Sequence, residues 1–459
     1  MAKYKAYAEY KTISNSWLDS IPNSWELLPL KYLCTSFVKD GPHETPVFLE
    51  EGIPFLSVDG IQDNKLVFEG CRYISPSDHF RFSQKCKPVK GDILLGKAAS
   101  IGKVALVDTS REFNVWSPLA VITPIRSCLS KFIYYSLQTT MLQAQCEVYS
   151  NSNTQKNLGM STIDNLDFAM PSDKEASTIS NFLDHETAKI DNLIEKQQQL
   201  IELLKEKRQA VISHAVTKGL NPDVPMKDSG VEWLGDVPEH WRINSLNHVL
   251  AAIGDVDHYM PQSVDDGIPY VMTGDLTEFV SGIQFSKCKQ VNFRDYLKLS
   301  KKIKSRLGDV IMARYATIGT VSYVDIDKDF LVSYSCVTIK PNPSKVVGLY
   351  LYYYFKSNSF LQGIQYQVNT NTQGNVGIND LSKMKIVLPS IKEQEEIIAH
   401  LQLDLENLDY LSTKSTQAIN LIQERRTALI SAAVTGKIDV RDWVTPDTQD
   451  VEEPQEATA

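Results

Sequence analysis

Two stretches of similar length decide the fold of this chain. Residues 171–217 read PSDKEASTISNFLDHETAKIDNLIEKQQQLIELLKEKRQAVISHAVT, and residues 389–435 read PSIKEQEEIIAHLQLDLENLDYLSTKSTQAINLIQERRTALISAAVT. Both open with Pro-Ser-x-x-Glu, which fits a helix capping box placed just after a proline. Both close with Ala-Val-Thr. The sequence therefore predicts one long helix in each of two equivalent places.

Within each stretch, apolar side chains recur at alternating spacings of four and three residues, as in a coiled-coil seam. The main seam residues are Ile179, Leu183, Ile190, Leu204, Val211, Leu401, Leu408, Leu411, Ile422 and Leu429. A helix of about 44 residues is roughly 65 Å long. Such a helix must bury its stripe on its twin or on a partner. Two ordinary core helices are the alternative.

Polar residues interrupt the seam at matching places in the two helices, and such residues can fix register and orientation. The matched pairs are Glu186 with Asp404, Gln197 with Ser415, and Lys207 with Arg425. If a two-fold axis relates the copies, the helices are antiparallel. Acidic residues near one end then approach basic residues near the other.

The helices belong to a longer internal repeat, because short motifs on both sides of them also recur in the same order. The pairs are Trp17-Leu18 and Trp233-Leu234, Pro22-x-x-Trp25 and Pro238-x-x-Trp241, Gly52-Ile53-Pro54 and Gly267-Ile268-Pro269, Cys71-Arg72 and Cys288-Lys289, and Gly91-Asp92-Ile93 and Gly308-Asp309-Val310. A period near 217 residues is too long for a solenoid unit. It indicates two copies of a whole domain with its connector.

The region before each helix is rich in β-branched and aromatic residues, with turn residues between short runs, and this indicates strands mixed with a few helices. We therefore expect an α+β (mixed α/β) fold. Two homologous domains in tandem would be separated by two long antiparallel coiled-coil helices with pseudo-two-fold symmetry. The predicted order is an N-terminal extension (1–19), a first domain (20–172), a first helix (173–217), a linker (218–236), a second domain (237–390), a second helix (391–435) and an acidic, disordered tail (436–459).

Catalytic and metal-binding signatures are missing from the sequence. We find no nucleotide-binding GxxxxGK[ST] loop, no HExxH zinc spacing and no adenine-methyltransferase tetrapeptide. The seven cysteines form no CxxC pair and are odd in number, so we expect reduced thiols and no zinc site. No membrane span or secretory signal is expected, which favours a cytoplasmic protein. The sequence predicts a non-catalytic chain without its own metal or cofactor, although an unfamiliar active site remains an alternative.

Basic residues gather at one position of each repeat, although the whole chain has a net charge of −9. Residues 81–103 hold six basic residues against one acidic, and residues 287–314 hold nine against two. Lys and Arg contacts to phosphates supply much of the affinity for DNA. The DNA-binding candidates from these regions and the motifs beside them are Arg72, Lys85, Lys87, Lys97, Lys103, Lys289, Lys302, Lys304 and Arg314. A solvated basic face is the alternative.

A short loop within each basic region has the same frame and different tips. Gly96-Lys97-Ala98-Ala99-Ser100-Ile101-Gly102-Lys103 aligns with Ala313-Arg314-Tyr315-Ala316-Thr317-Ile318-Gly319-Thr320. Small residues let a backbone approach a ligand closely, and a Lys or Arg at the start could reach a phosphate or a guanine edge. We add Tyr315 and Thr320 to the candidates, because divergent tips suit two different half-sites. Neutral drift of a loop is the alternative.

Two polar loops supply further candidates, YSNSNTQKN at residues 149–157 and YQVNTNTQGN at residues 366–375. Their Asn and Gln side chains could pair with adenine, and a lysine could take a phosphate. The residues chosen are Lys156, Asn157, Gln373 and Asn375. Structural turns capped by their own side chains are the alternative.

Taken in order, these motifs resemble the specificity subunit of type I restriction–modification enzymes. The carriers are WLGDVPEHW at residues 233–241, Gly91-Asp92-Ile93-Leu94-Leu95 leading to Ser100-Ile101-Gly102, the repeated Thr-Gln-x-Asn, and Pro-Ser-x-x-Glu opening a helix that closes near Ala-Val-Thr. The likeness covers about residues 15–437. The first entry departs from the pattern, with Asp19 where the second copy has Gly235.

The resemblance implies two target-recognition domains, each reading one half of an asymmetric bipartite DNA site. It implies that the paired helices set the spacer, and that the seam region binds two modification subunits, which carry S-adenosylmethionine and methylate adenine. Two restriction subunits would add ATP- and Mg-dependent translocation and cleavage. The resemblance gives the chain itself no catalytic residue and no cofactor.

Two other functions remain open at the level of the sequence. A self-contained DNA-modifying enzyme with a cryptic site would transfer a methyl group without partners. A coiled-coil scaffold that binds only proteins would keep its assembly when Lys97 and Arg314 are reversed in charge.

Overall fold

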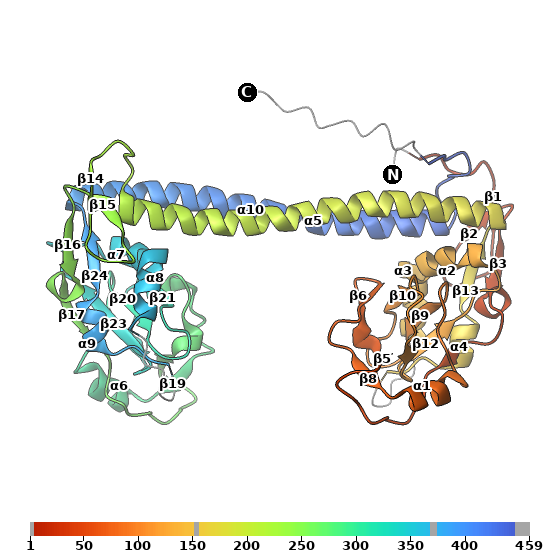
Figure 1. The fold of residues 1–459 in the computed structure, drawn as a ribbon, viewed down its shortest axis with the longest axis horizontal. Coiled ribbons are helices and arrows are strands. Elements are labelled where there is room, and N and C mark those ends of the chain that lie inside the picture. The colour runs from red at the N-terminus through yellow and green to blue at the C-terminus, as the bar shows by residue number, and fades with distance from the viewer. Residues whose placement is uncertain (1–3, 151–155, 368–373, 446–459) are drawn as a thin grey trace. The chain divides into compact units, whose positions relative to one another are not determined.

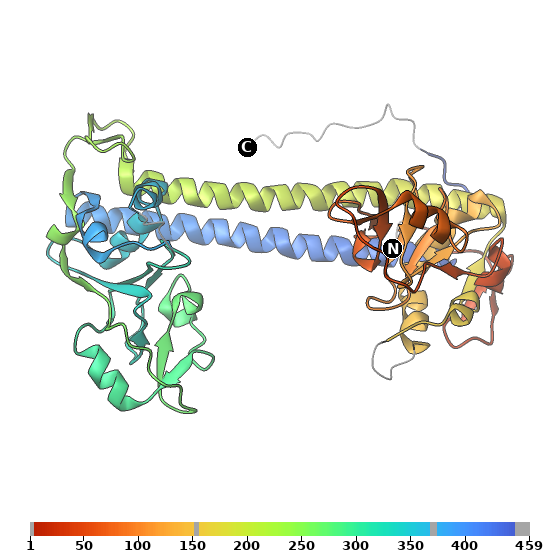
Figure 2. The same ribbon diagram turned by 60° about the horizontal axis from the view of Figure 1, so that its bottom comes forward.

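The computed structural model describes residues 4–150, 156–367 and 374–445. The chain forms two compact units. Unit 1 comprises residues 1–197 and 417–459, and unit 2 comprises residues 198–416. Figures 1 and 2 show that each unit holds one mixed domain together with part of both long helices.

Unit 1 is built on two small sheets. The first has the antiparallel order β10-β9-β12-β4, and the second has the order β11-β5-β8 with β11 parallel to β5. Its strands are β1 (Tyr10–Thr12), β2 (Ser20–Pro22), β3 (Glu26–Pro29), β4 (Lys39–Asp40), β5 (Ile53–Leu56), β6 (Ile61–Gln62), β7 (Lys65–Leu66), β8 (Arg72–Ile74), β9 (Ile93–Gly96), β10 (Val104–Leu106), β11 (Asn114–Val115), β12 (Leu119–Ile122) and β13 (Asp167–Met170). Its short helices are α1 (Pro76–Ser83), α2 (Ser130–Leu137), α3 (Thr140–Val148) and α4 (Met160–Asp164).

Unit 2 repeats this topology except for the hairpin of β6 and β7, which has no counterpart among its described strands. Its sheets have the orders β17-β23-β20-β21 and β19-β18-β22, and β16 pairs with β24 as β3 pairs with β13. Its strands are β14 (Met226–Asp228), β15 (Asp236–Pro238), β16 (Arg242–Ser245), β17 (Leu250–Gly254), β18 (Ile268–Val271), β19 (Lys289–Val291), β20 (Val310–Ala313), β21 (Val321–Tyr323), β22 (Leu331–Val332), β23 (Cys336–Pro341) and β24 (Lys385–Leu388), and its helices are α6 (Phe293–Ser300), α7 (Gly348–Lys356), α8 (Asn358–Gln365) and α9 (Ile378–Lys383). The prediction of two homologous α+β domains is therefore confirmed.

The two long helices are α5 (Asp173–Lys218) and α10 (Ile391–Val434). In unit 1, Ile179 and Leu183 near the start of α5 share a core with Ile430 near the end of α10. In unit 2, Ile212 near the end of α5 shares a core with Leu401 near the start of α10. The helices therefore pack antiparallel within each unit, as predicted.

Ion pairs between the helices repeat across the two units, but at residues other than those expected. Arg426 Nε lies 2.9 Å from Asp191 Oδ1 in unit 1, and Arg208 Nε lies 3.4 Å from Asp409 Oδ1 in unit 2. These are equivalent pairs, each one residue beyond the basic seam position that we expected to pair. Glu186 instead accepts a hydrogen bond from Tyr4, 3.2 Å away. Acidic and basic side chains of the two helices do attract each other, but the arginines that do so lie next to the expected seam positions.

A buried tryptophan is tied to the first turn of each long helix. Ser172 Oγ accepts the backbone N–H of Glu175 at 3.4 Å, as expected for a cap. The Glu175 carboxylate, however, accepts from Trp25 Nε1 at 3.0 Å and from Tyr7 Oη at 2.7 Å. In unit 2, Glu393 Oε1 accepts from Trp241 Nε1 at 2.9 Å. The glutamate of each expected capping box therefore joins its helix to the entry of the domain.

The segments expected as extension, linker and tail contain ordered structure. Strand β1 pairs with β2, and β14 pairs with β15 in the same way, so the extension and the linker carry equivalent hairpins. After the helix, Ile438 and Val440 are buried and Trp443 packs on Phe182. Apolar side chains hold these first tail residues on unit 1, whereas residues 446–459 lie outside the described part.

A membrane-crossing segment is not found among the helices of the described ranges, because none is both long enough and sufficiently apolar.

Replacing Glu175 tests the tie between the tryptophan and the helix. Glu175→Leu leaves the buried Trp25 N–H and Tyr7 O–H without an acceptor, which costs about 1–3 kcal/mol for each donor. Glu175→Gln keeps an acceptor oxygen and should lose much less stability. Urea unfolding followed by tryptophan fluorescence measures both variants, and equal stability of the two would contradict the assignment.

Candidate nucleic-acid interface

The loop after β9, residues 97–103, and its counterpart after β20, residues 314–320, have the same backbone conformation. Gly102 N donates to Gly96 O at 2.9 Å, and Gly319 N donates to Ala313 O at 3.1 Å. At the tip, Ala99 has φ +64° and Ala316 has φ +58°. A left-handed conformation is unfavourable for alanine, so the surrounding hydrogen bonds must impose it. Both domains therefore present a strained, preformed loop. We call residues 97–103 and residues 314–320 the tip loops.

Each tip loop pairs with the polar loop that the sequence singled out separately. Leu158 N donates to Lys97 O at 2.8 Å, and Ala98 and Asn157 form an isolated bridge. In unit 2, Val376 N donates to Arg314 O at 3.1 Å, and Tyr315 bridges Asn375. The structure thus brings two predicted regions onto one surface in each domain. Gln373 lies outside the described residues.

The cations at the start of the tip loops point inward. Lys97 is 6% exposed and Arg314 is 7% exposed. Lys97 Nζ lies 3.3 Å from Asp40 Oδ2, and Arg314 Nη2 lies 2.7 Å from Asp255 Oδ2. We expected these side chains to reach DNA, but their geometry makes them internal struts of the tip loop. The roles predicted for them at the DNA surface stay predictions.

Asp40 and Asp255 each gather two more polar side chains. Lys85 Nζ lies 2.6 Å from Asp40 Oδ1, and Lys302 Nζ lies 3.1 Å from Asp255 Oδ1. The partially exposed His43 and His258 also contact these carboxylates, with Nε2 at 3.1 and 3.3 Å. We call Asp40, His43, Lys85 and Lys97 the Asp40 cluster. Its equivalent, the Asp255 cluster, comprises Asp255, His258, Lys302 and Arg314.

The clusters shift the acidity of their carboxyl groups. Burial by itself would raise the pKa of Asp40, but hydrogen bonds and charge from Lys85 and Lys97 outweigh it and hold the pKa below its usual value. Burial acts in the same sense on Asp255, and Lys302 and Arg314 lower its pKa in the same way. Both carboxylates are therefore stabilised in the charged form.

Sequence reasoning missed both aspartates and both histidines. The available signal was the repeat itself, because Asp40-x-x-His43 returns as Asp255-x-x-His258. Its cationic partners are far away in the sequence, so the match by itself does not indicate a site.

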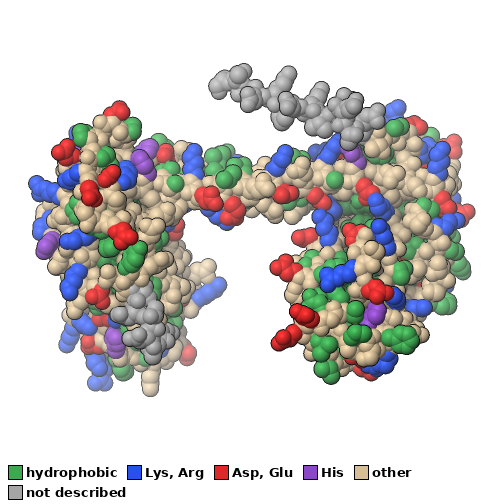
Figure 3. Space-filling view, viewed as in Figure 1, with side chains coloured by type: hydrophobic (Ala, Val, Ile, Leu, Met, Phe, Trp, Pro, Cys, Tyr) green, Lys and Arg blue, Asp and Glu red, His purple; other side chains and the backbone are tan. Residues whose placement is uncertain are grey.

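The other predicted DNA-binding residues lie around the same domains, in varied environments. Three lysines form ion pairs: Lys87 with Glu112 at 2.5 Å, Lys304 with Asp329 at 2.6 Å, and Lys156 with Glu147. Two cations lie over aromatic rings, Arg72 over Phe48 at 4.6 Å and Lys289 over Tyr270 at 5.9 Å. Lys103 Nζ donates to Ile61 O at 3.1 Å, and Thr320 is exposed. Figure 3 shows Lys and Arg side chains interspersed with acidic ones on each domain. The two domains share the Asp40 and Asp255 clusters.

The seam residues are mostly internal. Within the units, six of them are buried against the chain's own helices and domains: Ile179, Leu183, Ile190, Leu204, Leu401 and Leu408. Val211 and Leu429 pack on the cores from the edge, Ile422 is half-buried, and Leu411 is exposed. Apart from Leu411, a partner would therefore meet mainly other side chains of these helices.

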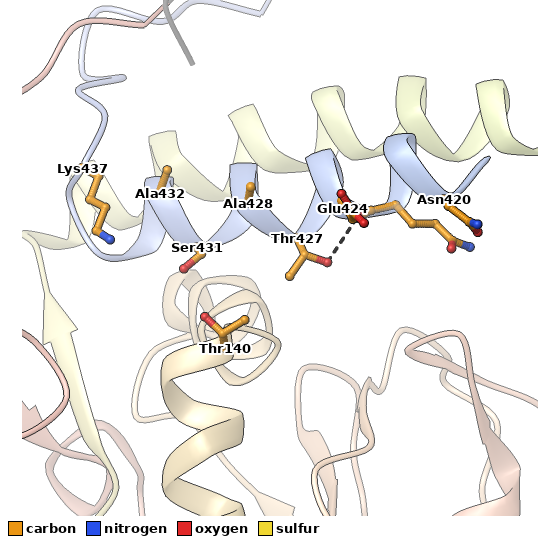
Figure 4. A pocket seen from close by; sticks show the side chains of 9 residues that line it. Thr140, Asn420, Glu424, Thr427, Ala428, Ser431, Ala432 and Lys437 are labelled. Carbon is orange, nitrogen blue, oxygen red and sulfur yellow. Dashed lines mark hydrogen bonds between the residues drawn. The ribbon is translucent and has the colours of Figure 1, made fainter. Parts of the chain in front are cut away.

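A groove of about 730 Å³ lies in unit 1 between α3 and α10 (Figure 4). Small and polar side chains line it, including Thr140, Thr427 and Ser431, and its charged members are Glu424 and Lys437. Within the described ranges, no group of His, Cys, Asp and Glu side chains has the arrangement of a metal site. The groove has no recognisable catalytic constellation.

Comparison with known proteins identifies one family along most of the chain. The family model for the type I restriction modification DNA specificity domain matches residues 22–203 and 253–421. The specificity subunit of the Escherichia coli type I restriction enzyme EcoBI is 21% identical over 212 residues, which are 44% of this chain and 43% of that protein. The match thus spans less than half the length of that relative.

Solved structures share the fold at low sequence identity. A chain from a study of complex assembly and conformational transition of the type I R-M system has 14% identity and a TM-score of 0.64, covering 91% of this chain and 99% of that chain. The HsdS subunit from Thermoanaerobacter tengcongensis has 14% identity and a TM-score of 0.50, covering 91% of this chain and 98% of that chain. These similarities show the fold.

An Asp255→Asn variant tests the charge of the cluster. Removing the carboxylate leaves Arg314 buried without its counter-ion, and we expect the free energy of unfolding to fall by about 3 kcal/mol at neutral pH. Because the pKa of Asp255 is lowered on folding, its stabilisation is present above the ordinary value of about 3.9 and is lost as the pH falls through the lower, folded value.

The difference in free energy of unfolding between the wild type and Asp255→Asn should therefore shrink as the pH falls. Urea unfolding from neutral to about pH 2 measures it. Asp257→Asn, which removes an exposed carboxylate 3.6 Å from the same Lys302, serves as the control and should have little effect. If this difference in free energy of unfolding is unchanged in acid, Asp255 is not charged in the folded protein.

Proposed function

The chain belongs to the type I restriction–modification DNA specificity family, and we propose that its two domains each bind one half of a bipartite DNA site through the tip loop and the polar loop paired with it. One observation carries this proposal. The same preformed loop pair, held by the same buried aspartate–cation strut, occurs in both domains, while its outward residues differ.

The divergent positions suit sequence reading. Ala98 is replaced by Tyr315, and Lys103 by Thr320. The aspartate of the strut is kept, and so is the Ile-Gly pair, which is Ile101-Gly102 in the first domain and Ile318-Gly319 in the second. Base edges differ between half-sites, so the residues that contact them must differ too. The supporting frame has the same task in both domains and can stay the same. Two different half-sites of one asymmetric site are the simplest ligand for such a pair.

Catalysis in this proposal belongs to partner subunits. Two modification subunits would carry S-adenosylmethionine and methylate adenine, and two restriction subunits would use ATP and Mg for translocation and cleavage. This chain would contribute recognition and a scaffold. Its repeat supports two equivalent docking places for the modification subunits.

Exposed leucines on the long helices are the best candidates for that docking. Unit 1 presents Leu193 and Leu421, which are 51% and 65% exposed, and unit 2 presents their repeat equivalents Leu411 and Leu203, 48% and 60% exposed. Their recurrence at equivalent places in both repeats supports an interaction surface that both units offer. Each unit would then offer the same surface to one modification subunit.

Substituting residues of the tip loop, or of the polar loop paired with it, in one domain should change one half of the methylated motif. We expect Lys156→Ala with Asn157→Ala to alter methylation only through the half read by the first domain, and Tyr315→Ala with Thr320→Ala only through the other half. Methylated adenines mapped across the host genome give the result. Tyr32→Ala is the control, because this exposed residue lies near the end of β12 away from the tip loop. Simultaneous change of both halves by one pair would contradict the proposal.

A charge on the leucine surface should weaken assembly. We expect Leu203→Arg to reduce binding of the modification subunit at least tenfold, because an apolar contact is replaced by a buried charge. Gln198→Arg adds the same charge five residues earlier, about 140° round the helix, and should bind normally. Analytical ultracentrifugation of the mixed subunits measures both. Equal affinities would exclude this helix face.

A further inference from the structure

The Asp40 and Asp255 clusters have the same internal plan. An aspartate stands three residues before a histidine, a lysine lies two residues after the end of α1 or α6, and the fourth member begins the tip loop. Only one substitution separates the clusters, Lys97 for Arg314. This identity contrasts with the divergent tips beside them, so the clusters serve a task that does not depend on the half-site.

Each cluster is divided into an inner and an outer pair. The aspartate and the tip-loop cation are nearly inaccessible, whereas the other two side chains face solvent. His43 and Lys85 have side chains that are 70% and 47% exposed, and His258 and Lys302 are 58% and 49% exposed. Two exposed nitrogen-bearing side chains are therefore held side by side on one carboxylate in each domain.

The outer pair is equipped to donate hydrogen bonds to an anion. An ammonium group has three N–H donors, and Lys85 Nζ uses contacts to Asp40 Oδ1 at 2.6 Å and Gly41 O at 2.7 Å. The histidine ring contacts the carboxylate through Nε2, so Nδ1 is its other polar atom, and it donates to an anion when the ring carries both protons. The carboxylate restricts both side chains, which reduces the entropy lost on binding.

A contact shared by both domains must recognise something present in both half-sites. Base edges do not meet this condition when the half-sites differ, but backbone phosphates do. We propose that His43 with Lys85, and His258 with Lys302, are the common phosphate contacts of the two domains, positioned by Asp40 and Asp255. This inference rests on the proposed function, and it assigns affinity to the clusters and sequence choice to the tips.

The two clusters differ in the charge around them. Asp257, 64% exposed, lies 3.6 Å from Lys302 Nζ, and the equivalent position in the first domain is Pro42. The extra carboxylate offsets part of the positive charge offered to a phosphate. The Asp40 cluster should therefore contribute more to salt-dependent binding than the Asp255 cluster.

Salt dependence of binding tests the assignment on the full chain assembled with its modification subunits. Two duplexes are compared, one with the methylated motif and one with a scrambled sequence. We expect Lys85→Met to lower the slope of log Kd against log salt by about 1 and to weaken both duplexes by the same factor. The methylated motif should stay unchanged, and Lys302→Met should show a smaller loss of slope.

Lys131→Met is the matched control, because Lys131 is 49% exposed and also pairs with a carboxylate, that of Asp184. It should leave the slope unchanged. Lys85→Arg keeps the charge and should restore the slope, which separates a lost phosphate contact from a misfolded loop. An unchanged slope for Lys85→Met, or a loss confined to the cognate duplex, would overturn the assignment. Failure of the wild-type complex to prefer the cognate duplex would instead refute the proposed function.

Discussion

The core of each unit is completed by the end of a long helix from the other repeat. In unit 1, Ile430 and Val434 of α10 lie in one cluster with Trp25 and the first domain. In unit 2, Ile212 and Val216 of α5 lie in the cluster of the second domain, where Tyr350 Oη also donates to Val216 O at 3.1 Å. One repeat by itself would expose this apolar surface to water. The antiparallel order of the helices follows from this exchange, and so does the need for two copies.

The exchanged helices give each domain a rigid base on which the tip loop can be held under strain. An alanine at positive φ persists only where its surroundings fix it, and here a hairpin and a buried aspartate–cation pair do so twice. The same device can therefore carry different residues at its surface. This explains how one fold, repeated with little change in its frame, can present two different recognition surfaces.

The repeat, the long helices and the mixed domains could be predicted because they depend on local patterns and on motif order. The strut between Lys97 and Asp40 could not, because 57 residues separate its partners and the sequence does not show which way a lysine points. Local spacing led us to expect the glutamate of Pro-Ser-x-x-Glu to cap its helix, but a tryptophan 150 residues away in the chain takes its carboxylate. The seam was found, whereas Arg426 and Arg208, one position away from the expected basic residues, make the ion pairs.

The central claim is that each domain is a separate reader whose output depends on its own surface and not on its place in the chain. The most direct measurement is the methylation motif produced by a chain in which residues 22–171 are replaced by residues 238–389, expressed with the same partner subunits. The account predicts a motif composed of two copies of the half-site that the second domain reads. A folded, assembled chimera that still methylates the original two-part motif would contradict it.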